Sequence, residues 1–236
     1  MNINLEKVRY SKVDREKNIK IPAVLTTELA EDIGIHIGDG SLYWSNQRKT
    51  STEFDCSFHA EEKSYREYVL NLKKRLYNIP RFRTYQYGNE LRLRFCSLAV
   101  ATFYHEVLKF PIGKKSDIVG IPKLILNAKD HDILASCLRG IVDTDFYVRI
   151  KPNGYRQMYG YFSSKNLIED LSILLKKLKI GHTTVFNAKK FDKRSNRNYK
   201  MHHIYISGHK RFNEYVAKAG FSNEKNIKKI NGPEAI

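Results

Sequence analysis

Two periods of hydrophobicity alternate along the chain, and they do so in the same order twice. Apolar residues recur three and four positions apart in the stretches 28–39 and 134–145, and beyond each stretch apolar and polar residues alternate. Residues three and four apart share one face of a helix, whereas strict alternation is typical of a strand with one buried face. Each half of the chain therefore predicts the order helix, hairpin, helix, hairpin, helix.

Turn residues and prolines give the bounds of these elements. In the first half we predict a hairpin over 41–58, a helix over 61–78 that Pro80 ends, a hairpin over 81–95 and a helix over 98–108. In the second half we predict a hairpin over 147–162, a helix over 167–178, a hairpin over 183–206 around a basic loop at 189–197, and a helix over 212–219. The predicted domains are an N-terminal extension at 1–24, a first half at 25–125 and a second half at 126–236.

Small residues line one face of each repeated helix. They recur every four residues, as Ala30, Gly34 and Gly38 in the first helix and as Ser136, Gly140 and Thr144 in the second. Glycine inside a helix costs about 0.5–1 kcal/mol relative to alanine, so its presence indicates a packing benefit. We predict that the two helices pack on each other through these faces, with their backbones unusually close.

Each repeated helix also ends on an acid, Asp39 in the first and Asp145 in the second. A carboxylate at a helix C-terminus meets the negative end of the helix dipole, which is unfavourable by about 0.3–1 kcal/mol. Packing the two helices together would add the repulsion between two like charges. A bound cation would relieve both, so the pattern favours a divalent metal with oxygen ligands.

The composition points to a polyanionic partner. The chain has 236 residues, with 42 Lys and Arg against 25 Asp and Glu, a formal net charge of +17 and a pI near 9.7. Such an excess is typical of proteins that bind nucleic acid or an anionic membrane. The sequence has no apolar run of transmembrane length, and its polar N-terminus does not resemble a secretory signal. We therefore expect a nucleic-acid partner, no membrane, and a cytoplasmic or organellar location.

Cysteine and histidine give no sign of a zinc site. Cys56, Cys96 and Cys137 are widely spaced and are expected to be buried, unpaired residues in a reducing compartment. The adjacent His202 and His203 are expected to lie in a strand.

The two acid-ending stretches, DIGIHIGDG at 32–40 and LRGIVDTDF at 138–146, resemble the motif of the LAGLIDADG homing endonucleases. The motif occurs twice, as in the monomeric members, and the resemblance covers residues 25 to 232. It implies an α+β fold of two pseudo-twofold-related αββαββα units. Each unit has an antiparallel four-stranded sheet, the two sheets form a DNA-binding saddle, and the units pack through the two motif helices.

This resemblance implies a monomeric enzyme that binds a long double-stranded DNA site and cuts both strands with Mg²⁺, with Mn²⁺ or Ca²⁺ as alternatives in a non-cleaving complex. Asp39 and Asp145 would be the catalytic metal ligands, and the carbonyls of Gly38 and Thr144 would share the metals. The loops at 113–116 and 223–226 look like those that carry basic catalytic residues, here Lys115 and Lys225.

Other polar residues near the motifs have different expected roles. His59 and Ser164 close the second strands and are further candidates for the site, while Asp143 is expected to be structural. One position departs from the family pattern: Phe146 replaces the usual Gly that Gly40 keeps in the first copy. This departure indicates unequal activity at the two acids.

The strand positions that do not face the helices are basic and aromatic, which suits contacts to phosphates and to base edges. The extension at 1–24 is expected on the surface or on the DNA. The predicted DNA-binding residues are Tyr43, Gln47, Arg48, Arg81, Arg83, Tyr85, Arg92, Arg94, Arg149, Lys151, Asn187, Lys189, Lys190, Arg194 and Arg197.

Two rival functions fit part of the same pattern. An RNA maturase that assists intron splicing, or a non-cleaving DNA-binding regulator, would keep the fold and the charge, and some maturases also keep both acids. An RNA-binding ribosomal or structural protein would explain the charge but not the paired motifs. Retention of Asp39 and Asp145 favours the endonuclease, encoded free-standing or within an intron.

Overall fold

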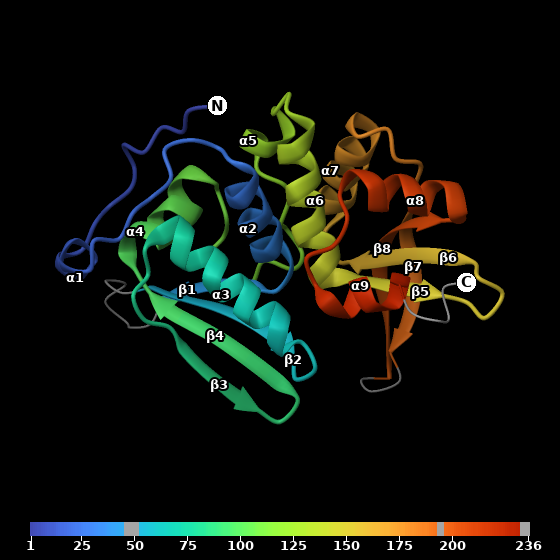
Figure 1. Ribbon diagram of the computed structural model, residues 1–236, viewed down its shortest axis with the longest axis horizontal. Helices are drawn as coiled ribbons and strands as arrows, with labels where there is room; N and C mark the ends of the chain where they lie inside the picture. The colour runs from blue at the N-terminus through green and yellow to red at the C-terminus, as the bar shows by residue number, and fades with distance from the viewer. Residues whose placement is uncertain (45–51, 193–195, 232–236) are drawn as a thin grey trace.

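The computed structural model describes residues 1–44, 52–192 and 196–231 of the chain (Figure 1). In the first half, α2 (Thr27–Gly38) leads into β1 (Gly40–Trp44) and β2 (Thr52–His59), then α3 (Lys63–Tyr77), β3 (Arg83–Tyr87), β4 (Glu90–Cys96) and α4 (Leu98–Thr102). A π-helical turn, η1 (Phe103–Val107), continues α4, and α5 (Lys123–Leu126) precedes the second half. There, α6 (His131–Asp145) leads into β5 (Phe146–Ile150), β6 (Arg156–Phe162), α7 (Lys165–Lys177), β7 (Thr183–Asp192), β8 (Arg197–Ser207), α8 (His209–Lys218) and α9 (Glu224–Asn231).

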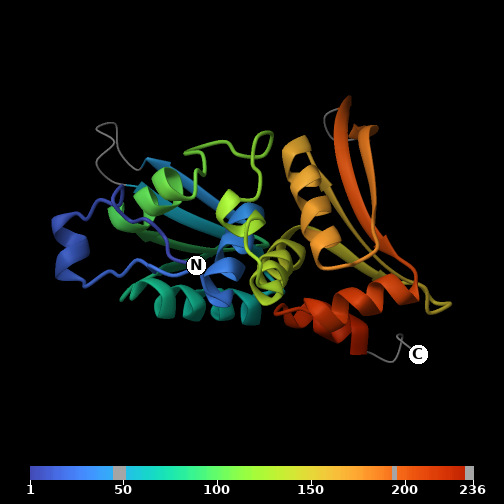
Figure 2. The ribbon, with the colours of Figure 1, turned by 90° about the horizontal axis from the view of Figure 1, so that it is seen from above.

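Each half contains one antiparallel four-stranded sheet, with the strand orders β1-β2-β4-β3 and β5-β6-β8-β7. The two halves repeat the same order of helices and strands, and α2 and α6 lie side by side between them (Figure 2). The predicted α+β fold, with two repeated units joined through the motif helices, is confirmed.

Local sequence explains where the helices begin and end. Thr26 caps α2 by accepting a hydrogen bond from the Leu29 N–H, and Asp130 caps α6 in the same way through the Asp132 N–H. Helix α3 ends at Asn78, whose φ of 53° is left-handed, just ahead of Pro80. Polar residues thus set the helix ends that the hydrophobic period alone leaves open.

The inner face of each sheet packs on its own helices. Leu42, Phe54 and Leu93 are buried beneath the helices of the first half, and Met158 and Ile204 do the same in the second. The alternate residues of both sheets face away from the helices. Burial of this apolar layer is the main favourable term for folding, and it fixes the strand register, because a slip by one residue would turn every side chain over.

The N-terminal extension folds back on the first half instead of lying loosely on its surface. Ile3, Ile19 and Ile21 are buried in the core, and a short helix, α1 (Lys12–Glu16), lies between them. The buried carboxylate of Asp14 accepts hydrogen bonds from the N–H groups of Ser11 and Ala99, which ties α1 to α4. The many charged residues of this segment did not indicate burial, but three isoleucines among them pack into the core.

Two predicted element boundaries and one predicted burial were wrong. Most of the predicted basic loop at 189–197 belongs to β7 and β8, because a bulge between Val185 and Ala188 resets the register and lets pairing continue. The bulge contains Asn187, whose φ is 56°. Helix α9 occupies part of the predicted loop at 223–226. Cys96, predicted to be buried, is exposed at the end of β4, while Cys56 and Cys137 are buried as expected.

His202 and His203 lie in β8, as expected. No helix in the described part of the chain has the length and apolar character needed to cross a bilayer.

Candidate nuclease site and nucleic-acid interface

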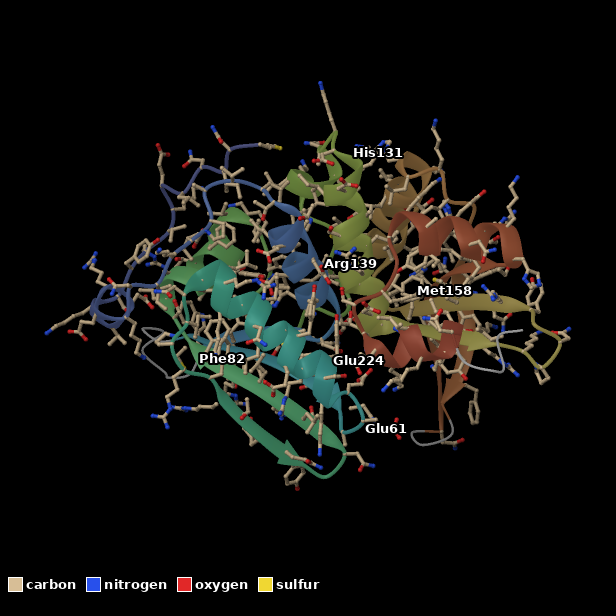
Figure 3. All side chains as sticks on the ribbon, viewed as in Figure 1. Glu61, Phe82, His131, Arg139, Met158 and Glu224 are labelled. Carbon is tan, nitrogen blue, oxygen red and sulfur yellow. The ribbon has the colours of Figure 1, made fainter. Side chains whose placement is uncertain are left out.

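The two motif helices touch through the small residues that the sequence singled out. A Cβ added to Gly34 would lie 2.2 Å from the Cys137 carbonyl oxygen, and one added to Gly140 would lie 2.4 Å from the Glu31 carbonyl oxygen. Backbone meets backbone here, so only glycine fits. An ion pair of 2.7 Å between Arg139 on α6 and Glu31 on α2 spans the same seam, where Figure 3 labels Arg139 between the two helices.

This packing brings Asp39 and Asp145 to one end of the seam. Asp39 follows the last turn of α2 and its N–H donates to the Ile35 carbonyl at 3.0 Å; Asp145 is the last residue of α6. A Cβ on Gly38 would lie 3.2 Å from the Asp145 carboxylate, which places that carboxylate against the end of α2. The acids predicted to pair are thus brought together from the two halves.

The surroundings of the acids raise the pKa of both carboxyl groups. Burial is the main cause for Asp39, the charge of Asp145 is the second, and together they hold its pKa well above the ordinary value. The pKa of Asp145 is raised to about 6, chiefly because protein atoms crowd its carboxylate, although the residue remains open to solvent. The surroundings therefore disfavour the charged form of both carboxyl groups, and a bound cation would favour it.

The side chain of Lys115 caps the C-terminal end of α2. Its ammonium group donates to the carbonyl oxygens of His36 and Ile37 at 2.5 Å and of Gly38 at 2.6 Å, which would otherwise lack helical partners. Burial lowers the pKa of Lys115 to about 8, against the opposing attraction of Asp145 and Asp39. A single cation thus stands beside both acids.

The second half closes its motif helix differently. The Asn223 side chain donates to the Asp143 carbonyl oxygen at 3.3 Å, which makes Asn223, not Lys225, the structural counterpart of Lys115. Lys225 instead lies 3.7 Å from a carboxylate oxygen of Glu62, at the start of α3 in the other half. Lys225 is also 38% exposed, so the two predicted basic residues have unequal environments.

Most of the predicted DNA-binding residues that the structure describes lie in the strands of the two sheets. Tyr43, Arg83, Tyr85, Arg92 and Arg94 lie on the outward face of the first sheet, and Arg149 and Lys189 lie on exposed positions of the second. Arg81 precedes β3 and Lys151 follows β5, so both lie beside a sheet and not within it. Lys190 and Arg197 belong to β7 and β8, and Asn187 belongs to the bulge. The predicted residues Gln47, Arg48 and Arg194 lie outside the described residues.

Comparison with known proteins supports this architecture. The homing endonuclease I-DmoI superposes with a TM-score of 0.58 at 14% identity, over 82% of this chain and 95% of the other. The homing endonuclease I-WcaI, bound to its DNA recognition sequence, superposes with a TM-score of 0.54 at 18% identity, over 93% of this chain and 92% of the other. The chain has the LAGLIDADG fold.

Sequence similarity to known proteins is weaker evidence than the similarity of the fold. No family model matches the chain. A curated relative, the glutamine–fructose-6-phosphate aminotransferase of Methanocaldococcus jannaschii, is 25% identical over 230 residues, which is 97% of this chain but 19% of the relative. The chain thus spans about a fifth of the length of that relative.

Within the LAGLIDADG fold, the other motif acids are structural. Asp143 accepts hydrogen bonds from the N–H groups of Ser222 and Asn223 and from the Asn226 side chain, at 2.6, 3.1 and 2.9 Å. Burial, only partly offset by these bonds, raises the pKa of Asp143 to about 7. Asp32 lies in the core of the first half, bonded to Lys73, Tyr77 and Tyr104. Neither acid faces the pair at the seam.

The candidates at the strand ends also serve the fold. Ser164 is buried at the start of α7, where its hydroxyl donates to the Val119 carbonyl oxygen at 2.6 Å and accepts from the Leu167 N–H. His59 is exposed at the end of β2, and its backbone N–H donates to Glu62 at 3.0 Å. The hydroxyl of Ser164 is therefore committed to capping.

Sequence reasoning missed Glu62 and Asn223. Glu62 adds to the negative charge around Asp39 and accepts a 3.0 Å hydrogen bond from Asn223 across the two halves. Figure 3 labels their chain neighbours Glu61 and Glu224 on these facing segments. The position of Glu62 just before a helix was a cue for a cap, but its partners come from residues about 160 positions away.

Proposed function

We propose that the protein is a site-specific endonuclease that binds double-stranded DNA across the outward faces of its two sheets and hydrolyses both strands with a divalent metal. The observation that carries the proposal is the meeting of Asp39 and Asp145, one from each motif helix, with Lys115 between them and the helix carbonyls. The structures of I-DmoI in complex with DNA and Mn, and of I-WcaI on its recognition sequence, support DNA and a metal as ligands.

The residues at the seam fit a divalent cation. Two carboxylates whose pKa values are raised by burial, and in Asp39 also by the partner's charge, gain from a positive ion between them. Among the described residues no cluster of three or more acidic, histidine or cysteine side chains forms a closed metal cage. Mg²⁺ typically takes one or two carboxylates and keeps several waters, which suits an open pair of acids.

The predicted carbonyl ligands are compatible with this site. The Gly38 carbonyl already accepts from Lys115, but a carbonyl oxygen has two lone pairs and can bind a second partner. The metal, when bound, would activate a water molecule and stabilise charge on the phosphate. Asp39 and Asp145 would hold it, and Lys115 would offer its ammonium charge to the phosphoryl oxygens.

Replacing either acid tests the proposal. We expect Asp39→Asn and Asp145→Asn to reduce double-strand cleavage at least about a thousandfold, because each removes a charged metal ligand, while DNA binding persists. The substrate is a plasmid carrying a site selected from random duplex DNA by the wild-type protein, and the readout is linear product with Mg²⁺. Asp132→Asn, at the exposed start of α6, is the matched control and should cut normally.

Other outcomes point to other functions. Unchanged cutting in both acid variants would remove these residues from the chemistry. Tight binding by the wild-type protein without cutting would favour a non-cleaving regulator, and preference for a folded intron RNA over the duplex would favour a maturase. We also propose that the protein acts as a monomer, since its two halves already supply both acids.

A further inference from the structure

A charged cluster lies on the outward face of the first sheet, where Asp55 is the cross-strand partner of Ser41, two residues after Asp39. It consists of Asp55 on β2 with Arg92 and Arg94 on β4, and we call it the Asp55 cluster. One oxygen of the Asp55 carboxylate, Oδ2, accepts hydrogen bonds from Arg92 at 3.0 Å and from Arg94 at 2.8 Å. Asp55 and Arg94 are direct cross-strand partners, and Arg92 lies at the preceding outward position of β4.

In the Asp55 cluster the carboxylate is buried, whereas the two arginine side chains are partly exposed to solvent. Asp55 is 2% exposed, whereas the side chains of Arg92 and Arg94 are 33% and 22% exposed. The Arg94 guanidinium also lies 5.4 Å from the ring centre of Tyr85 and 5.7 Å from that of Tyr43. Arg92 makes a second ion pair with Glu90 at 3.0 Å. Both guanidinium groups are thus held in set directions at the surface.

The charge of the cluster does not suit a general contact to phosphates. Asp55 and Glu90 together balance the charges of Arg92 and Arg94, so the four groups have little net attraction for a polyanion. A fixed guanidinium is instead suited to guanine, whose O6 and N7 atoms accept two parallel hydrogen bonds in the major groove. Recognition of guanine therefore depends on the orientation of the guanidinium group more than on its charge.

We propose that Asp55 is a positioning residue of the DNA-binding face: it holds Arg92 and Arg94 in the orientation that recognises guanine in the half-site under the first sheet. This inference rests on the proposed binding of double-stranded DNA. It adds which base the first half selects and which buried residue sets that selection.

The second sheet shows that the fold itself does not require a carboxylate at this place. Tyr159 has the matching register there, paired with Tyr147 and Tyr205 as Asp55 is paired with Ser41 and Arg94. The other Asp55 oxygen, Oδ1, is buried and has no hydrogen-bond partner among the described residues. Burying an unsatisfied carboxylate oxygen is costly, which argues against a role in stability alone.

The test compares base preferences of the wild-type protein and Asp55→Asn. Each is bound to a library of random duplex DNA with Ca²⁺, a metal with which I-DmoI was studied on DNA, and the bound sequences are read. We expect guanine at two positions of one half-site for the wild type. For Asp55→Asn we expect that preference to fall about tenfold at each position, with the other half-site unchanged.

Two further variants keep the test decisive. Arg94→Lys retains the charge but loses the planar fork, so it should lose guanine preference at one position even if Asp55→Asn folds poorly. Tyr159→Phe, at the matching place in the second sheet, should leave the guanine positions intact. Thermal unfolding of every variant identifies those that fail to fold.

A uniform loss of affinity in Asp55→Asn, with base preferences unchanged, would overturn the inference, as would a wild-type site without guanine in that half. Cleavage of the selected site separates this result from the proposed function. If the wild type cuts but Asp55→Asn keeps its preferences, only the role of Asp55 fails. If the wild type selects guanine but does not cut, the nuclease proposal fails and the role of Asp55 stands.

Discussion

The two halves of this protein share a backbone plan but close their motif helices with different chemistry. At the end of α2, one ammonium group, that of Lys115, binds three carbonyl oxygens. At the end of α6, an amide from Asn223 binds one carbonyl, and the adjacent Asp143 carboxylate anchors the loop. Among the described residues, the positive charge that acts on both acids therefore comes from Lys115 of the first half.

The outward faces of the sheets differ in the same way. Register matches Asp55, Arg92 and Arg94 of the first sheet with Tyr159, His203 and Tyr205 of the second. Residues of the second set take part in a series of ring contacts. The ring centroids of Tyr161 and His203 are 5.2 Å apart, and those of Tyr159 and Tyr161 are 5.9 Å apart. One face offers fixed charges and the other offers aromatic surface.

This difference shows which features the repeated fold requires. Both halves keep small residues at the seam and alternating apolar residues under the sheet, because the packing depends on them. The groups that face a ligand are free to diverge, because they contribute little to the core. Under the proposed function, such a pair of unlike faces would bind two DNA half-sites of unlike sequence.

Among the differences between the two halves, the largest expected effect separates the two lysines. We expect Lys115→Met to slow cleavage about 100- to 1,000-fold, because it removes a cation that interacts with both acids. We expect Lys225→Met to slow it only a few-fold, since Lys225 pairs loosely with Glu62 and is partly exposed. Single-turnover cutting of each strand measures both effects.

The control for this pair is stability, because Lys115 also binds the end of α2. Thermal unfolding and DNA affinity of Lys115→Met, measured beside the rates, show whether the site was lost through the fold. Equal losses of activity in the two variants would mean that the halves are catalytically equivalent despite their different loops.

The next effect concerns the seam that the halves share. Gly140→Ala would place a Cβ 2.4 Å from the Glu31 carbonyl oxygen and 2.8 Å from the Ile35 nitrogen, so the helices must separate. We expect a loss of about 2 kcal/mol in the free energy of unfolding, since overpacking outweighs the gain in helix propensity. Urea denaturation of the variant and the wild type measures this loss.

Gly181→Ala provides the comparison for Gly140→Ala. The three atoms nearest to its added Cβ all belong to the flexible side chain of Arg211, the closest at 2.9 Å, and this side chain can move aside. We expect a change below about 0.5 kcal/mol for this variant. A similar cost at both glycines would show that the close approach of α2 and α6 is not what selects glycine at position 140.

Features encoded in short stretches of the sequence were predicted better than features that depend on contacts between distant segments. The motif helices, the alternating strands and the acids at the helix ends are encoded in short stretches, and the structure has them where the periods placed them. The hairpin of β7 and β8 was predicted, but its strands were predicted too short, because the basic residues beyond Lys189 resemble a loop and only pairing across the bulge keeps them in strands.

The parts of the site that were missed depend on contacts between segments far apart in the sequence. Lys115 and Lys225 occupy similar loops and looked equivalent, yet only one reaches its helix end. Asp55 is one acid in a polar alternation until β4 brings two arginines over it. Such roles follow from packing geometry, which the hydrophobic period does not contain.

The smallest expected effect compares the two protonation states of the acid on α6. Because Asp145 has a folded-state pKa of about 6 against an ordinary value near 4, the folded protein binds its proton more tightly than the unfolded chain. Stability contributed by the protonated form is then lost as the pH rises from about 4 through 6.

Asp145→Asn should therefore be as stable as wild type near pH 4 and more stable above pH 6. We expect a gain of about 1 kcal/mol, since the side chain is exposed and solvent screens much of the effect.

Thermal unfolding at pH 4 and pH 8 measures this gain, which corresponds to about 2–4 °C for a chain of this size. Asp132→Asn, an exposed acid at the other end of α6, should show no such pH-dependent gain. Added Mg²⁺ should shrink or reverse the difference at pH 8, because only the wild type keeps both carboxylates that would bind the ion. Destabilisation by Asp145→Asn at pH 8 without metal would mean that the carboxylate already has a stabilising partner. The repulsion at the seam would then not be the force that a cation relieves.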